Sequence, residues 1–213
     1  MCSSDLLGVE VQSVAVTAGY MHAEARRDFY AKMDAANVDL KAFTEEFYER
    51  VTFARLGPVL ETLEYLVRET RVWTEITTLL IPGHNDSEEE VERLSRWVVE
   101  HLGVDVPLHF TAFHPDFKMQ DVPPTPPATL RRAREIARSH GLRFVYTGNV
   151  HDADGDATSC PQCGEVVIAR DWHELRAYRL TPQGRCESCG FALPGRFADR
   201  AGSWGRRRQR VAI

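Results

Sequence analysis

The stretch Val72–Asp86, V-W-T-E-I-T-T-L-L-I-P-G-H-N-D, decides the fold. Residues 72–81 are mostly β-branched, aromatic or aliphatic and carry almost no charge, whereas the Pro-Gly pair that comes next introduces turn chemistry. Ser87 and Glu90 then have the spacing of a capping box, in which each residue serves a backbone N–H of the other. This pattern predicts a buried parallel strand that passes through a short loop into a helix.

Segments of the same kind, each followed by a helix-like apolar stripe, recur along the chain. The predicted strands are residues 9–17, 37–43, 107–112 and 144–146, in addition to the stretch above. Strands that alternate with helices at this spacing predict right-handed β-α-β crossovers and a parallel sheet, either barrel-like or doubly wound. No G-x-G-x-x-G or G-x-x-x-x-G-K-S/T motif follows a strand, so the two common nucleotide-binding interpretations lose support.

Polar side chains gather at or near the carboxyl ends of these predicted strands. In a β/α barrel this end carries the functional site, and residues two apart on a strand share one face. Glu75 and Thr77 therefore point the same way from an otherwise apolar strand. The candidate residues at this end are Thr17, Asp39, Lys41, Glu75, Thr77, His109, His114 and Asn149.

Composition limits the classes of function. The formal net charge of -5 argues against general affinity for nucleic acids, although it excludes no local site. The apolar runs have the length of strands, so no membrane span is predicted, and the amino terminus lacks the features of a signal peptide. A cytoplasmic location is expected, where closely spaced cysteines indicate a metal before a disulfide.

Two C-x-x-C-G knuckles near the carboxyl terminus are the strongest spacing signal. Their cysteines are Cys160, Cys163, Cys186 and Cys189. The glycine after each knuckle permits a tight turn that aims backbone N–H groups at the thiolates, and four sulfurs complete a tetrahedral shell. We expect one metal ion, zinc first and iron second, rather than paired disulfides or free thiols. Four cysteines leave no open coordination position, so the expected role is structural.

Taken together, four segments and the ribbon after them resemble the radical S-adenosylmethionine (SAM) enzymes of the AmmeMemoRadiSam group, which are similar to the pyruvate formate-lyase activating enzymes. The segments are N-V-D-L-K-A-F at 37–43, W-T-E-I-T-T-L-L-I-P-G-H-N-D at 73–86, P-L-H-F-T-A-F-H-P-D-F at 107–117 and Y-T-G-N-V-H at 146–151. The resemblance implies an α/β fold: an incomplete parallel β/α barrel of the TIM type, followed by a small rubredoxin-like zinc ribbon.

The same resemblance implies an oxidoreductase activity for the intact enzyme. A 4Fe-4S cluster in the barrel lumen would bind SAM, and one-electron reduction would cleave SAM to a 5'-deoxyadenosyl radical that abstracts hydrogen. The substrate and the electron donor are not indicated, with a protein as one candidate substrate. No nucleic-acid or membrane partner is expected.

One departure from the resemblance is as informative as the match. The family's cluster needs a C-x-x-x-C-x-x-C motif and its cofactor's amino group a G-G-E-type segment, and this chain contains neither. We therefore interpret the chain as a carboxyl-terminal part that is inactive alone. The expected division is a non-native leader at 1–6 that includes Cys2, barrel at 7–152, ribbon at 153–200 and basic tail at 201–213.

Carried over by position, the resemblance assigns SAM contacts. Asp39 and Lys41 match a D-x-K pair that would face the ribose and carboxylate side of SAM, although an ion pair between strands is the alternative. His114 would lie near the adenine, and Asn149 would bond the adenosyl group or hold its own turn. The remaining assigned contacts, from the strand that touches SAM in the activating enzymes, are Glu75 and Thr77.

Two other classes of function compete. A metal-dependent hydrolase in a β/α barrel would place a lumen metal among four scattered residues, His84, His109, His114 and Asp39. Alternatively, the ribbon and the basic tail would form a binding module on an inert scaffold, which the acidic total charge weakens. Metal content separates the three interpretations.

Overall fold

The computed structural model describes residues 12–172 and 174–197 of the 213-residue chain. The predicted leader at 1–6 with Cys2 and the predicted basic tail at 201–213 lie outside these residues. The described residues form a five-stranded parallel sheet with its helices and, after it, a smaller three-stranded antiparallel sheet.

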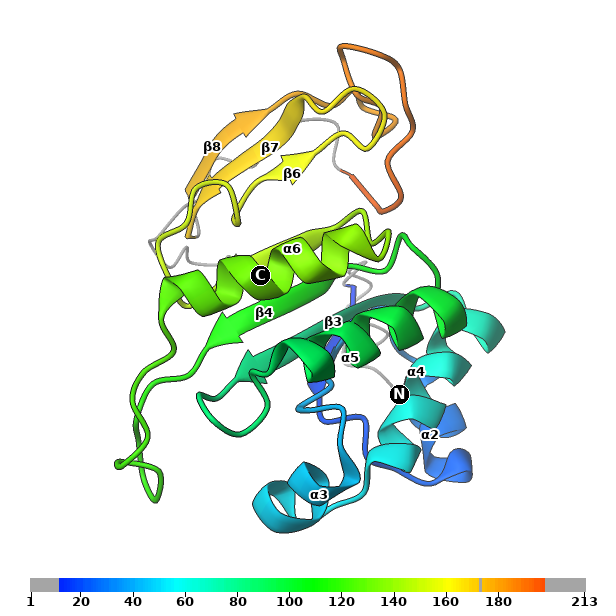
Figure 1. Cartoon of the computed structure of the whole chain (residues 1–213). Helices are drawn as coiled ribbons and strands as arrows, with labels where there is room; N and C mark the ends of the chain where they lie inside the picture. Colours follow the sequence, from blue (N-terminus) through cyan, green and yellow to red (C-terminus); the bar gives the residue numbers. More distant parts are fainter. Residues whose placement is uncertain (1–11, 173, 198–213) are drawn as a thin grey trace, which may run out of the picture.

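The large sheet runs in sequential order, β1-β2-β3-β4-β5, and every neighbouring pair is parallel. Its strands are β1 (Val14–Thr17), β2 (Ala35–Asp39), β3 (Trp73–Leu80), β4 (Leu108–Ala112) and β5 (Val145–Gly148). The helices lie on one face of the sheet (Figure 1). Sequential order with helices on one side is the arrangement of a partial β/α barrel, so the barrel-like prediction is confirmed and the doubly wound alternative is wrong.

Helices follow the strands as predicted, although the first of them buries Arg26 and Tyr30 rather than an apolar stripe. They are α2 (Ala23–Tyr30), α3 (Glu45–Phe47), a π-helical turn η1 (Tyr48–Thr52), α4 (Leu56–Glu69), α5 (Glu88–His101) and α6 (Pro127–Ser139). Gly103 and Gly141 take positive φ angles of 99° and 105° just after α5 and α6, which is the left-handed conformation that ends helices.

One hydrophobic core fills the space between the sheet and its helices. Alternate residues of β3 are buried, because Ile76 and Leu80 point toward the helices whereas Glu75 and Thr77 point to the opposite, concave face. Strand β4, which is paired on both sides, contributes Phe110, which is fully buried. The concave face is therefore free to carry polar side chains, as the alternation in the sequence predicts.

The first strand leaves part of the concave face uncovered. Val14 and Val16 of β1 are 62% and 80% exposed, although the neighbouring residue Ala15 is buried on the helical face. Two exposed valines on an edge strand are an apolar surface that a folded sheet ordinarily covers.

The small sheet contains β6 (Thr158–Ser159), β7 (Val166–Asp171) and β8 (Glu174–Tyr178) in sequential antiparallel order. Figure 1 shows it as a separate layer next to α6 and the large sheet. It has its own small core, and Phe144, the residue before β5, packs into this core. The fold class predicted from the sequence, a partial barrel followed by a small ribbon with clustered cysteines, is confirmed.

Two details differ from the predictions. The second strand is Ala35–Asp39 rather than 37–43. The Leu40 N–H still donates to the Thr77 carbonyl at 3.0 Å, but side chains then replace strand pairing: the Leu40 carbonyl accepts from the Thr78 hydroxyl at 2.9 Å, and the Lys41 N–H donates to the Tyr48 hydroxyl at 3.1 Å. The first and fifth strands are likewise Val14–Thr17, within the described part of 9–17, and Val145–Gly148. Their bounds are set by pairing with β2 and β4, which a local pattern does not encode.

The capping box forms only by half. The Ser87 hydroxyl accepts from the backbone N–H of Glu90 at 3.2 Å, as predicted. The Glu90 carboxylate does not return to the cap; it accepts from the backbone N–H of Phe43 at 2.6 Å. A tertiary contact to the loop after β2 has taken the place of the local one.

This contact gives a prediction about pH. Burial raises the pKa of Glu90, outweighing the opposing effect of the Phe43 N–H. A raised pKa means that the folded state binds the proton more tightly, so stability is lost as the pH rises from the usual carboxyl range through the raised value. We expect Glu90→Gln, which cannot ionise, to remove this loss of stability. The loss amounts to about 1.4 kcal/mol for each unit by which the pKa of Glu90 is raised.

Urea unfolding of the wild type and of Glu90→Gln between pH 4 and pH 8 measures the effect. Glu89→Gln, at an exposed neighbour paired with Arg93, is the matched control and should leave the pH dependence unchanged. Equal slopes for Glu90→Gln and the wild type would contradict the prediction.

Candidate functional site

The four cysteines of the ribbon meet at one point. One ligand atom from each of Cys160, Cys163, Cys186 and Cys189 lies within 4.8 Å of the others. The sulfurs of Cys160 and Cys189 are 3.5 Å apart, and those of Cys163 and Cys186 are 3.8 Å apart. A tetrahedral zinc site with Zn–S bonds of about 2.3 Å requires sulfurs about 3.8 Å apart. The donor set therefore fits one tetrathiolate ion.

The two knuckles have the same backbone geometry. Gly164 donates to the Cys160 carbonyl at 2.9 Å, and Gly190 donates to the Cys186 carbonyl at 2.8 Å. Both glycines have positive φ angles, 78° and 77°, as the C-x-x-C-G pattern predicts. Burial acts to raise the pKa of Cys186, but hydrogen bonds from the N–H groups of Cys189 and Ser188 outweigh it and lower that pKa to about 7. The N–H groups of this knuckle thus favour the thiolate of Cys186, the form that binds metals.

A second set of polar residues lies at the carboxyl ends of the sheet strands. Lys41 Nζ lies 2.8 Å from the Asp39 carboxylate, and both side chains are about one third exposed. The Thr77 hydroxyl donates to Asn37 of the neighbouring strand at 2.8 Å. Asn149, with φ of 60°, donates to the Ala112 carbonyl at the end of β4. These residues lie near the carboxyl ends of their strands, whereas Glu75 and His109, which were predicted there too, are the third residue of β3 and the second residue of β4.

Buried polar side chains hold this edge in place. Asn85 is 2% exposed; its oxygen accepts from the Ile81 N–H at 2.6 Å, and its amide nitrogen donates to the carbonyls of Lys41 and Leu79. Thr125 does the same for the next loop, donating to the Leu80 carbonyl at 2.6 Å. The loops that carry the polar edge are therefore fixed by hydrogen bonds inside the protein rather than by packing alone.

Further down the concave face, three side chains form a network around Glu75. Trp73 Nε1 donates to one carboxylate oxygen at 2.9 Å, and His109 Nε2 lies 2.9 Å from the other. The His109 ring stacks on Tyr146 with ring centres 5.0 Å apart. Burial acts to raise the pKa of Glu75, but the contacts with His109 and Trp73 outweigh it and lower that pKa. Glu75 is thus ionised near neutral pH, and its oxygens are engaged within the sheet.

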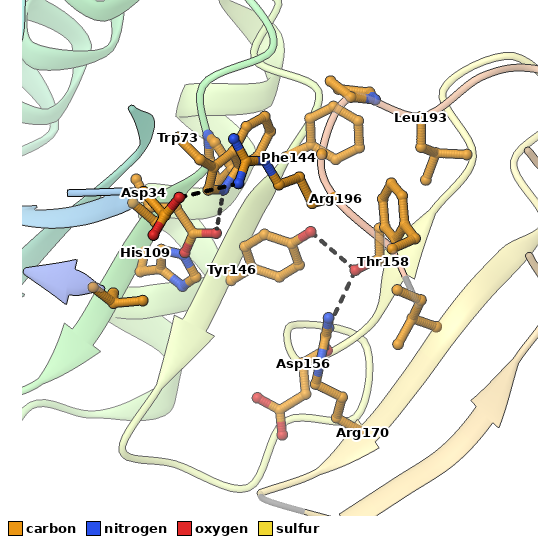
Figure 2. A pocket seen from close by; sticks show the side chains of 18 of the residues that line it. Asp34, Trp73, His109, Phe144, Tyr146, Asp156, Thr158, Arg170, Leu193 and Arg196 are labelled. Atoms are coloured by element: carbon orange, nitrogen blue, oxygen red, sulfur yellow. Dashed lines mark hydrogen bonds and ion pairs between the residues drawn. The ribbon is translucent and has the colours of Figure 1, made fainter. Parts of the chain in front are cut away.

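Tyr146 connects the sheet to the ribbon. Its hydroxyl is 2.9 Å from that of Thr158, which also accepts from Arg170 at 3.1 Å (Figure 2). Burial raises the pKa of Tyr146, so this hydroxyl stays protonated. Tyr146, Thr158 and Arg170 were not recognised in the sequence, because their contacts join strands that no local pattern connects.

The scattered histidines do not form a metal site. Among the described residues, the four ribbon cysteines are the only set of three or more metal-ligating side chains that converge. His84, His109, His114 and Asp39 are not brought together, and His114 is exposed on the loop after β4. The hydrolase interpretation therefore has no metal centre in this part of the chain.

Within the same residues, no helix has the length and apolar character needed to cross a bilayer.

The fold places the chain in a known structural class: it resembles the fold of radical SAM enzymes. A domain of a pyruvate-formate lyase-activating enzyme from Bacteroides vulgatus superposes with a TM-score of 0.58 at 13% identity, over 68% of this chain and 84% of that domain. A radical SAM methyltransferase from Sphaerobacter thermophilus superposes with a TM-score of 0.54 at 18% identity, over 72% of this chain and 43% of that enzyme.

At the level of sequence, no protein-family model matches the chain. An uncharacterized protein of Methanocaldococcus jannaschii, MJ0808, is 40% identical over 179 residues, which are 84% of this chain and 53% of MJ0808. The chain thus spans about half the length of the curated relative that it matches.

Proposed function

We propose that this chain is the carboxyl-terminal part of a radical SAM enzyme similar to the pyruvate formate-lyase activating enzymes. The observation that carries the proposal is the row of polar side chains at the carboxyl edge of a sheet whose fold resembles solved radical SAM structures. In β/α barrels this edge is where substrates and cofactors bind.

The polar edge fits the polar groups of SAM. Lys41 supplies a cation for the cofactor's carboxylate, and Asp39 accepts from the ribose hydroxyls. Thr77 and the amide oxygen of Asn149 offer further hydrogen bonds on the same face, and His114 presents an exposed ring for the adenine. Glu75 remains assigned to this face, where it fixes the position of His109 through the contact at 2.9 Å. In the intact enzyme, SAM bound at a 4Fe-4S cluster would be the source of a 5'-deoxyadenosyl radical.

The residues present do not fit the cluster itself. Of the five cysteines, four form the ribbon site and the fifth is Cys2, so no set of three remains for a 4Fe-4S cluster. In this proposal the cluster ligands belong to the remainder of the intact enzyme, and this chain alone does not perform the radical chemistry. The exposed valines of β1 support the proposal, since further chain would cover them.

We assign zinc to the ribbon, with iron as the second choice, in a structural role. All four ligands come from the protein, so the ion has no position for a substrate. A ribbon that serves only as a nucleic-acid module is less well supported, because its residues also form the network with Tyr146 on the sheet.

SAM binding tests the proposal. We expect the purified chain to bind SAM measurably by calorimetry, and Lys41→Ala to weaken binding about tenfold because it removes the cation that meets the carboxylate. Lys32→Ala, an exposed lysine beyond the end of α2, is the matched control and should leave the affinity unchanged. Absence of SAM binding, or equal affinities for the two variants, would contradict the assignment.

Anaerobic reconstitution with iron and sulfide tests the statement about the cluster. We expect one metal ion per chain and no 4Fe-4S signal in the electron paramagnetic resonance spectrum of the reduced protein. A 4Fe-4S signal that responds to SAM would show that other ligands replace the missing cysteines.

A further inference from the structure

A cavity lies between the ribbon and the amino-terminal half of the sheet, on the concave face. Its volume is about 590 Å³, within the range of small-molecule sites. Strand-start residues such as Ala35, Trp73 and Pro107 line one side, and ribbon residues such as Ile168 and Leu193 line the other. The cavity is thus distinct from the carboxyl edge that carries the Asp39–Lys41 pair.

Aromatic rings make up much of its wall. The rings are those of Trp73, His109, Phe144, Tyr146 and Phe197. Figure 2 shows the first four around one space, with ribbon residues opposite. Ring faces carry partial negative charge and attract cations that approach them within about 6 Å. The wall already holds one cation in this way, since the Arg170 guanidinium lies 5.9 Å from the centre of the Tyr146 ring.

Carboxylates outnumber cationic groups in the cavity. Asp34, Glu75 and Asp156 line it, together with Arg170 and Arg196. Arg196 lies 3.4 Å from Asp34, so these two neutralise each other, whereas Arg170 donates to the carbonyl of Asp156 rather than to its carboxylate. The remaining charge on the lining is negative.

Two of these carboxylates have unused capacity for hydrogen bonds. An ionised carboxylate has about four acceptor positions, and Glu75 uses one on each oxygen. Among the described residues, none donates a hydrogen bond to the side chain of Asp156. Burial, followed by the nearby Asp152, raises the pKa of Asp156, and the opposing attraction of Arg170 is too small to reverse this shift. The cavity therefore offers free acceptors and ring faces beside its two guanidinium groups.

We propose that this cavity binds a small planar cation of the amidinium or guanidinium class, which stacks on the aromatic wall and donates to the Glu75 carboxylate in the field of Asp156. A planar cation satisfies both features at once, since its face meets the rings and its N–H groups meet the carboxylate. Neutral and anionic ligands of the same shape lose one or both interactions. This binding site lies at the starts of the strands, and it shares Glu75 with the SAM site proposed above.

Benzamidine is a suitable probe, because it is a flat ring that carries an amidinium. Calorimetry on the full chain should show benzamidine binding, with the neutral isostere benzamide and the anion benzoate at least tenfold weaker. Glu75→Gln should weaken benzamidine binding at least tenfold, and Asp156→Asn severalfold. Glu92→Gln, at an exposed carboxylate of α5, is the control and should have no effect.

Asp156→Asn separates this proposal from the proposed function, since Asp156 belongs to the ribbon side of the cavity and has no role in the SAM assignment. We expect this variant to lose benzamidine affinity while it retains SAM affinity. The proposal would be overturned by no benzamidine binding, by equal binding of benzamidine and benzoate, or by unchanged affinity in both variants.

Discussion

Replacing Cys186 with serine is expected to abolish metal binding and to unfold the ribbon, while the five-stranded sheet stays folded. The ribbon's own core is small, and two of its buried members are the candidate ligands Cys160 and Cys186. Structural zinc sites contribute about 10–16 kcal/mol of binding energy to such modules at neutral pH, which exceeds what a core of this size supplies. The same result is expected when a strong chelator removes the ion.

Metal analysis and hydrogen exchange together measure this effect. The wild type should contain one ion per chain and Cys186→Ser none, and amide protection should be lost in β7 and β8 but kept in β3 and β4. Cys2→Ser is the matched control because it changes a cysteine outside the ligand set, and it should leave metal content and protection unaltered. Retained protection of β7 and β8 without metal would show that the ribbon's packing is sufficient, and the structural role of the ion would be rejected.

Unfolding of the ribbon should also affect β5, the strand at one side of the large sheet. Phe144 packs in the ribbon core, and Tyr146 bonds Thr158, so β5 loses contacts when the ribbon unfolds. Strand β5 pairs with β4 on one side only. Its exchange rates should therefore rise more than those of β3, which is paired on both sides. The ribbon in this view both carries the metal and completes the end of the sheet.

The sequence-based predictions are accurate where the interactions behind them join residues that are close together in the chain. The C-x-x-C-G knuckles are local, since their turns depend on residues within the same few positions, and the predicted cluster of four cysteines is confirmed. Alternation in β3 is likewise local and correctly divides Glu75 from Ile76. Strand periodicity also suffices to predict a parallel sheet, because the crossovers allow few other arrangements.

A local sequence pattern does not predict interactions between segments that are far apart in the chain. Glu90 has the spacing of a capping box, but the partner that it bonds, Phe43, lies on another loop. Asn85 has the sequence context of an ordinary turn residue, although it is among the most buried polar side chains. The cavity next to the ribbon depends on how two sheets pack, so its lining, with Asp156 opposite Trp73, has no signature in the sequence. The assigned SAM contacts stay predictions until binding is measured; they are Asp39, Lys41, Glu75, Thr77, His114 and Asn149.

Asn85→Asp is expected to destabilise the protein by about 3 kcal/mol or more at pH 7, although it changes one nitrogen to one oxygen. The Asn85 amide nitrogen donates to the carbonyls of Lys41 and Leu79, at 2.6 Å and 2.9 Å. A carboxylate has no donor there, so both bonds are lost and a negative charge faces two carbonyl oxygens. Each lost bond that leaves a buried group unsatisfied costs about 1–3 kcal/mol.

The pH dependence identifies this cause. The introduced carboxyl group, when protonated, could donate one of the two bonds, so folding favours the protonated form and raises the pKa of that carboxyl. A raised pKa in the folded state means that stability is lost as the pH rises from the unfolded carboxyl range through the raised value. The difference in stability between the variant and the wild type should therefore be smallest near pH 4 and largest at neutral pH.

Urea unfolding followed by circular dichroism measures both quantities. Asp86→Asn is the matched control, since it makes the reverse change at the next residue, and an asparagine oxygen can still accept from the Gly83 N–H that Asp86 binds at 2.8 Å. The control should shift stability by less than about 0.5 kcal/mol, as surface substitutions usually do. A pH-independent loss for Asn85→Asp would point to altered packing instead. If Asn85 holds Lys41 as the hydrogen bond indicates, the variant should also bind SAM more weakly under conditions where it remains folded, which connects the buried asparagine to the proposed cofactor edge.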